Sequence, residues 1–162
     1  MRKLISLLLV GWICLGAACG VWADDRSTGD DQKLVSESVE YYRDGSMLVI
    51  SVFEEPVLSR SNLYNKLGRK VYEYCDVNGT ILWSFAVTGE FRILEGASVT
   101  CISATCSSEI YESAWSCTRK TAAPSGSWAI ANGEFAKTLL GIVVSRESVD
   151  VSLTCDVYGN LS

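Results

Sequence analysis

Residues 81–93 alternate, over thirteen positions, between a mostly apolar set of side chains and a more polar set. A period of two places successive side chains on opposite faces of an extended strand. The pattern therefore predicts a half-buried β-strand that needs a core against one face. The apolar set consists of Ile81, Trp83, Phe85, Val87, Gly89, Phe91 and Ile93.

The same period of two returns elsewhere in the chain. Residues 148–157 place alternate apolar side chains on one face, and residues 127–135 alternate small and large residues. Residues 47–53 form a hydrophobic run of the kind found in buried strands. Together they predict an all-β fold of about seven strands, an antiparallel β-sandwich, with a small β-barrel as the alternative. Residues 57–69 have no clean period and predict a long loop.

A turn is predicted at Asp-Val-Asn-Gly (76–79), before the strand at 81–93. Asn-Gly accepts positive φ at both central positions of a tight hairpin, so a β-hairpin is expected here. Segments 75–81 (CDVNGTI) and 155–161 (CDVYGNL) share the pattern C-D-V-x-G and a final aliphatic residue. Because their flanks do not match, chance or shared turn chemistry explains the pair more simply than duplication.

The N-terminal residues predict export. Arg2 and Lys3 precede an apolar stretch, and small residues then lead to Ala23, as in signal peptides that are cleaved. The competing interpretations are a signal anchor and lipoprotein processing at Cys19. A signal peptide at 1–23 predicts a secreted, extracellular protein, with association to the cell wall as one form of that location.

The remaining chain is long enough for one domain with a hydrophobic core. Residues 24–45 are polar and acidic and predict a weakly ordered lead-in, in which 33–42 is a candidate short helix or strand. Residues 46–162 are expected to form a single β-rich domain.

Charge and composition exclude several classes of function. The full chain has a net charge of −5, and the predicted signal carries two basic residues and no acidic ones, so the exported chain is still more acidic. Such a chain repels polyphosphate and anionic lipid, so neither nucleic acid nor membrane is an expected partner after signal cleavage. Its basic residues come in twos and threes, as on a solvated face. They include Arg60, Lys66, Arg69, Lys70, Arg119 and Lys120.

The chain contains no histidine. This excludes nucleophilic enzymes that use a Ser-His or Cys-His pair, and it removes the usual ligand of catalytic zinc. No catalytic residue, metal site or cofactor is therefore predicted, and the chain is not expected to be an enzyme. An enzyme here would have to use carboxylates, lysine or tyrosine.

Five of the seven cysteines lie after the predicted signal. In an exported chain, cysteines are first interpreted as disulfide partners. Cys101 and Cys155 share the inward phase of their strands, and a bridge between them is favoured. Cys106 and Cys117 are the second predicted bridge, which leaves Cys75 as a free thiol. A bridge between Cys75 and Cys155 would overturn this pairing.

Carboxylates and aromatic rings supply the remaining candidate sites. Trp83 and Trp115 fall in the apolar phase and are expected in the core. Tyr72 and Tyr74 share one strand face and, with Trp128, form a candidate aromatic binding surface. The acidic candidates for a hydrolase are interpreted as exposed structural residues. They are Glu54, Glu55, Glu90, Glu109 and Glu112.

The order of several short motifs resembles a family of small secreted proteins from Gram-positive bacteria, classed as a domain of unknown function. The motifs, within residues 70–162, are LWSFAVTGEF (82–91), SVTC (98–101), IYESAW (110–115), SGSWA (125–129) and LTCDVYGNLS (153–162). The resemblance implies an extracytoplasmic β-rich module. It also supports pairing Cys101 with Cys155, whose counterparts recur in the family, whereas Cys106 and Cys117 look like additions. The family implies no activity and no functional residue.

The sequence thus favours a secreted binding or interaction module that acts at a cell surface or envelope. Expected partners are a cell-wall polymer, a glycan or a surface protein. The alternatives are a diffusible antagonist, either bacteriocin-like or an immunity-type factor, and a carboxylate-dependent hydrolase. Neither ligand nor oligomeric state follows from the sequence.

Overall fold

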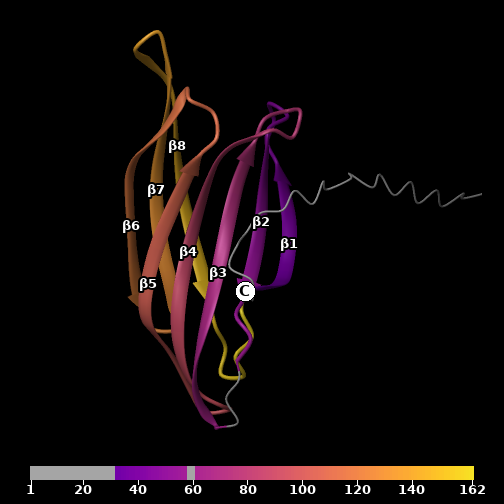
Figure 1. Ribbon diagram of the computed structural model, residues 1–162, viewed down its shortest axis with the longest axis vertical. Coiled ribbons are helices and arrows are strands. Elements are labelled where there is room, and N and C mark those ends of the chain that lie inside the picture. Colours follow the sequence, from indigo (N-terminus) through magenta and orange to yellow (C-terminus); the bar gives the residue numbers. More distant parts are fainter. Residues whose placement is uncertain (1–31, 58–60) are drawn as a thin grey trace, which may run out of the picture.

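The computed structural model describes residues 32–57 and 61–162 and contains eight β-strands in that part of the chain (Figure 1). The predicted signal peptide, with its two competing interpretations, lies outside these residues. The strands are β1 (Lys33–Tyr41), β2 (Met47–Glu54), β3 (Leu63–Cys75), β4 (Ile81–Leu94), β5 (Ser98–Ile110), β6 (Trp115–Ser125), β7 (Trp128–Leu139) and β8 (Ile142–Thr154). The described residues form no helix long and apolar enough to span a lipid bilayer.

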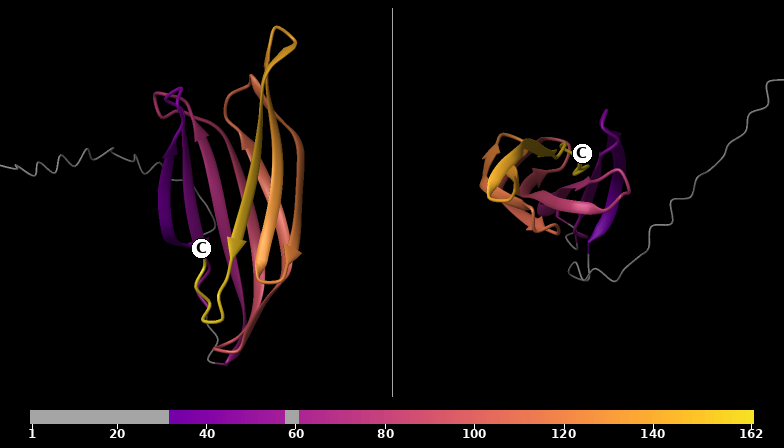
Figure 2. Two further views of the ribbon diagram at one scale, coloured as in Figure 1. Left: turned by 180° about the vertical axis from the view of Figure 1, so that it is seen from behind. Right: turned by 90° about the horizontal axis from the view of Figure 1, so that it is seen from above.

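The strands form two antiparallel sheets, in the orders β1-β2-β3-β4-β5 and β6-β7-β8. Within each sheet, every strand pairs with its neighbour in sequence, and the chain passes from one sheet to the other between β5 and β6. Figure 2 shows the two sheets as separate layers. The all-β fold and the antiparallel pairing were predicted correctly. The alternative prediction was a small β-barrel. Within the described residues, however, the strands form two sheets and do not close into one continuous sheet.

The core lies between the sheets, and β4 supplies its centre. Trp83, Phe85, Val87, Phe91 and Ile93 are all buried, so the predicted inward face of 81–93 is confirmed. Ser84 and Ala86 on the opposite face are buried as well, so the middle of β4 is covered on both faces. The opposing residues on β7 are small. A Cβ added to Gly89 would lie 2.7 Å from the Cβ of Ala129, so the sheets approach closely at this point.

Aromatic rings fill another part of the interface between the sheets. Trp83 stacks on Phe135 with ring centroids 4.0 Å apart and planes 9° apart, which joins β4 to β7. Tyr74 stacks on Trp83 at 5.1 Å and meets Trp115 edge to face at 5.9 Å. Trp83 and Trp115 are therefore core residues, as predicted.

The structure corrects the long loop expected at residues 57–69, because β3 already begins at Leu63. The segment pairs with β4 from its first residue. Its alternation was hidden because its inward positions are not aliphatic: Tyr64 and Lys66 are half-buried, and Gly68 is buried. Gly68 leaves room for the C-terminal segment, since an added Cβ would lie 2.5 Å from a Leu161 methyl group.

Segments 75–81 and 155–161 form the same turn. The Asp76 carboxylate accepts hydrogen bonds from the backbone amides of Asn78 and Thr80, and Asp156 accepts them from Tyr158 and Asn160. The hydrogen bond from the Thr80 amide chiefly lowers the pKa of Asp76, and those from the side chain and the backbone amide of Asn160 lower the pKa of Asp156. The common sequence is explained by this turn, which is the shared turn chemistry that was predicted.

The expected hairpin geometry at Asn78-Gly79 needs a correction. Gly79 has a φ of 81°, whereas Asn78 is not among the described residues with positive φ. The Asp76 carboxylate winds residues 76–79 into a four-residue turn, which needs the left-handed conformation only at the glycine.

Candidate functional site

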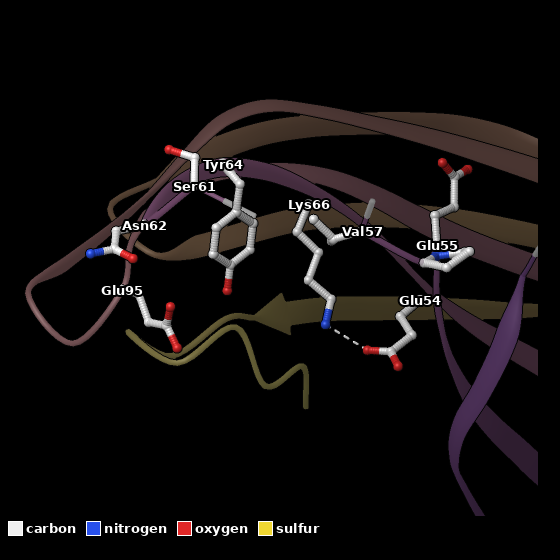
Figure 3. Close-up of a pocket in the computed structure, with 9 residues that line it drawn as sticks. Glu54, Glu55, Val57, Ser61, Asn62, Tyr64, Lys66 and Glu95 are labelled. Atoms are coloured by element: carbon white, nitrogen blue, oxygen red, sulfur yellow. Dashed lines mark hydrogen bonds and ion pairs between the residues drawn. The ribbon is translucent and has the colours of Figure 1, made fainter. Parts of the chain in front are cut away.

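An open groove of about 340 Å³ lies where β2 ends and β3 begins (Figure 3). Its lining combines three carboxylates, one ammonium group, one phenol ring and one amide. The lining residues are Glu54, Glu55, Pro56, Val57, Ser61, Asn62, Tyr64, Lys66 and Glu95. The strand-ending Glu-Glu-Pro that follows residues 47–53 forms one wall of this groove, because β2 ends at Glu54.

Lys66 makes the contacts that hold one wall of the groove together. Its ammonium nitrogen lies 2.5 Å from Glu54 Oε2 and donates a hydrogen bond to the Gly159 carbonyl oxygen at 2.8 Å. Its side chain is only 13% exposed. The expectation that this lysine belongs to a solvated face is therefore wrong. Lys66 occupies an inward-facing position of β3, so its side chain points toward the C-terminal segment. There the Glu54 carboxylate and the Gly159 carbonyl take the place of water as partners of the ammonium group.

These contacts set the charges inside the groove. The hydrogen bond from Lys66 holds the pKa of Glu54 below its usual value, so this carboxylate is ionised at neutral pH. Burial raises the pKa of Tyr64, and the charge of Glu95 raises it further. Tyr64 therefore keeps its proton, and its hydroxyl can donate as well as accept.

The side chains are arranged around the tyrosine ring. Figure 3 shows Tyr64 between Asn62 and Glu95 on one side and Lys66 on the other. The Glu55 carboxylate points away from that of Glu54, as expected for neighbours at a strand end. A flat ring bordered by acceptors, an amide and a donor suits a ligand rich in hydroxyl groups. The net charge of the lining is negative, which disfavours anionic ligands.

Two of the carboxylates considered for a hydrolase, Glu90 and Glu109, lie far apart, whereas Glu55 and Glu90 line the same open pocket. Glu90 pairs with Ser103 and Glu109 with Ser84, so six positions along β4 separate them. At the rise of a strand this is about 20 Å, whereas the two carboxylates of a glycosidase lie about 5 to 10 Å apart. Glu90 accepts a hydrogen bond from Asn65, and Glu109 accepts one from Tyr111.

The predicted aromatic surface is divided between the two sheets. Tyr72 and Tyr74 lie near the end of β3 and pack against the core, and the Tyr74 hydroxyl donates to Ser46 at 3.1 Å. Trp128 begins β7 in the other sheet and is 45% exposed. Since β3 and β7 run in the same direction, Trp128 lies at the end of the molecule opposite to Tyr74 (Figure 1).

All five described cysteines are thiols, so neither predicted bridge is present in the structure. Cys101 and Cys155 are nevertheless neighbours in the fold. Their backbone amides donate to the carbonyl oxygens of the adjacent residues Gly126 and Ser127, at 2.7 and 3.2 Å. Both side chains belong to the buried core. Burial raises the pKa of the Cys101 thiol and that of Cys155, the latter to about 11.

The other cysteines lie apart from this pair. Cys106 and Cys117 are half-buried on β5 and β6, and Cys75 is buried at the end of β3. Across residues 32–57 and 61–162, no group of three acidic or cysteine side chains is placed to hold a metal ion.

Sequence reasoning missed the groove because Asn62, Tyr64 and Lys66 fall in the segment expected to be a loop. The only signal was the spacing of Tyr64, Lys66 and Gly68, which is that of a strand face. Comparison with known proteins adds no relative: no family model, no curated protein and no solved structure matches the chain.

Proposed function

We propose that this chain is a secreted binding module that holds an uncharged, hydroxyl-rich polymer, such as a cell-wall glycan, in the groove beside Tyr64. The observation that carries the proposal is the mixed lining of that groove. Asn62 and Lys66 offer donors, Glu54 and Glu95 offer acceptors, and the tyrosine ring offers a face for a sugar ring.

The form of the site supports binding rather than catalysis. The groove is open, and its one lysine is engaged by Glu54 and by the Gly159 carbonyl, so it is not poised as a nucleophile or a base. The surplus of carboxylates favours a neutral polymer over an anionic one. The signal sequence expected at residues 1–23 and the resemblance to small secreted proteins agree with a role at the cell surface.

In this proposal the two sheets form a β-sandwich that a cystine between Cys101 and Cys155 stabilises after export. Two thiols would each lose a hydrogen atom to a small disulfide such as oxidised glutathione, which is reduced to two thiols. The support is the shared position of the two residues beside Gly126 and Ser127. Intact mass and peptide mapping of protein recovered from the culture medium test this step, and two free thiols would contradict it.

The binding proposal is tested with the chain that lacks residues 1–23, by sedimentation with insoluble Gram-positive cell walls and with walls stripped of their anionic polymers. We expect the chain to bind both wall preparations. Tyr64→Ala should weaken this binding by at least about tenfold, because it removes the aromatic ring on which a bound sugar would stack. Tyr158→Ala, on an exposed tyrosine outside the groove lining, is the matched control. Equal binding by both variants, or no binding to walls, would overturn the proposed site.

A further inference from the structure

The hairpin between β7 and β8 ends in a tip made only of apolar residues. Residues 139–144 read Leu-Leu-Gly-Ile-Val-Val, and all five large side chains are exposed. Leu140 is the extreme case, at 95% exposure. The tip projects beyond the neighbouring turns at the same end of the molecule (Figure 1). An exposed apolar cluster of this kind is typical of an interaction site.

The backbone of the tip gives a second observation. Leu140 and Gly141 form a two-residue turn, with φ values of 51° and 80°. Both central positions are thus left-handed, as in the type I′ turn that favours Asn-Gly. Leu140 is the one non-glycine among the described residues with positive φ. A leucine that is exposed and also held in an unfavourable conformation marks a position where the sequence serves something other than stability.

The distribution of side chains around the tip indicates what it contacts. Neighbouring residues of a strand face opposite sides, so Ile142 and Val143 cover both faces of the ribbon. Leu139 pairs with Ile142 and adds to the same cluster. Docking on a protein requires apolar side chains on one face of the ribbon. Insertion into a bilayer surrounds the ribbon with lipid acyl chains and so requires apolar side chains on both faces.

Basic groups follow directly below the apolar tip. Lys137 pairs with Ser145 and Arg146 with Ala136, on the rungs that precede the cluster. Arg146 is exposed, and the ammonium group of the half-buried Lys137 lies over the Trp115 ring, 5.8 Å from its centroid. Leu140 lies three positions after Lys137, which corresponds to about 10 Å along a strand. That is the depth to which interfacial segments insert, so Arg146 would meet the phosphate groups of the lipid directly, and Lys137 would meet them on leaving the Trp115 ring.

We propose that the tip of the β7–β8 hairpin inserts into the interface of an uncharged, phosphatidylcholine-like lipid bilayer, with Lys137 and Arg146 at the headgroups. The insertion is shallow, because the backbone groups at the free edges of the ribbon need water or headgroups as partners. The acidic charge of the chain was the reason to expect no membrane partner, and it disfavours anionic lipid only. This inference is independent of the groove, which is lined by the end of β2 and the start of β3, at the end of the molecule opposite to the β7–β8 hairpin (Figure 1).

The test uses the chain that lacks residues 1–23, which retains every described residue, and large vesicles of pure phosphatidylcholine. Leu140→Trp places a reporter at the tip, and Leu63→Trp places one on an exposed position at the start of β3. We expect the emission of the tip reporter to shift to the blue with added vesicles and to be quenched by brominated lipid. The β3 reporter should show neither change beyond the wild-type signal.

Two tip variants test whether vesicle binding depends on the apolar side chains of the hairpin. Leu140→Asn suits the turn, so it should keep the fold yet float with vesicles about tenfold less well, and Ile142→Glu should abolish flotation. No shift of the tip reporter at any lipid concentration would overturn the proposal. So would a shift that needs no vesicles and grows with protein concentration, because the tip would then contact a second copy of the chain.

Discussion

Lys66 and Glu54 form an ion pair, 2.5 Å between Nζ and Oε2, that links the end of β2 to the start of β3. The same ammonium group binds the Gly159 carbonyl at 2.8 Å and so ties the C-terminal segment to the larger sheet. The pair lies in the wall of the groove, where both side chains are mostly buried. One lysine therefore contributes to stability and shapes the candidate binding site.

Replacing Lys66 by methionine should lower the free energy of unfolding by about 1 to 3 kcal/mol, because the partly buried Glu54 carboxylate loses its closer donor and the Gly159 carbonyl loses a hydrogen bond. Urea denaturation measures the change. Lys33→Met is the matched control: Lys33 contacts the same carboxylate at 3.5 Å, but its side chain is 76% exposed. That control should cost less than about 0.5 kcal/mol. Equal losses in the two variants would contradict the role given to Lys66.

Glu54 should make the protein sensitive to acid. Its pKa is lowered in the folded state, so its contribution to stability is complete above the unfolded value, about 4.3, and is lost as the pH falls through the folded value. Glu54→Gln should therefore flatten the fall of the unfolding free energy below about pH 4. Glu55→Gln, whose carboxylate points away from Lys66, is the control. An unchanged acid slope in Glu54→Gln would refute the assignment.

Phe135→Ala should lower the free energy of unfolding by about 3 to 5 kcal/mol. Phe135 is 1% exposed and stacks on Trp83 across the two sheets, so its removal opens a cavity between them. Near-ultraviolet circular dichroism should lose part of its tryptophan signal at the same time. Tyr158→Ala, on an exposed ring, should change stability by less than about 0.5 kcal/mol. A small effect of Phe135→Ala would mean that the sheets do not depend on this contact.

The sequence predicts the centre of the fold better than its ends. Phe85, Phe91 and Ile93 keep a strict period of two because β4 has one face on the core along its whole length. The turn at 75–81 was also located correctly. Asp76 and Gly79 are spaced as in a tight turn, in which the aspartate accepts backbone hydrogen bonds and the glycine adopts positive φ. Local pattern is sufficient where burial alone decides which residue type is present.

The groove could not be predicted for the opposite reason. Lys66 and Tyr64 occupy inward positions of β3, yet they are neither small nor aliphatic, and periodicity treats them as breaks in the strand. The partners of Lys66 are Glu54, twelve residues away, and Gly159, ninety-three residues away. Contacts at such separations are set by the tertiary fold and leave no local pattern in the sequence.

In the reduced protein, Cys155 should be the slowest of the described cysteines to be alkylated at pH 8. Its pKa of about 11 leaves little thiolate, and its side chain is 2% exposed. Mass mapping after timed exposure to iodoacetamide measures the rates. Cys106, which is half-buried, should react faster and serves as the internal reference. Modification of Cys155 before Cys106 in folded protein would contradict the burial of its thiol.

Leu140→Asn should raise the free energy of unfolding by about 0.5 to 1 kcal/mol. Leu140 has a φ of 51°, where the Cβ of a leucine comes too close to the carbonyl oxygen, and asparagine tolerates this conformation far better. The change removes no buried contact, because the leucine is 95% exposed. Leu139→Asn, one residue earlier in β7, lacks the positive φ and should bring no gain in a urea titration. A gain for both variants would assign the effect to the loss of an exposed leucine, whereas a gain at position 140 alone assigns it to the backbone of the turn.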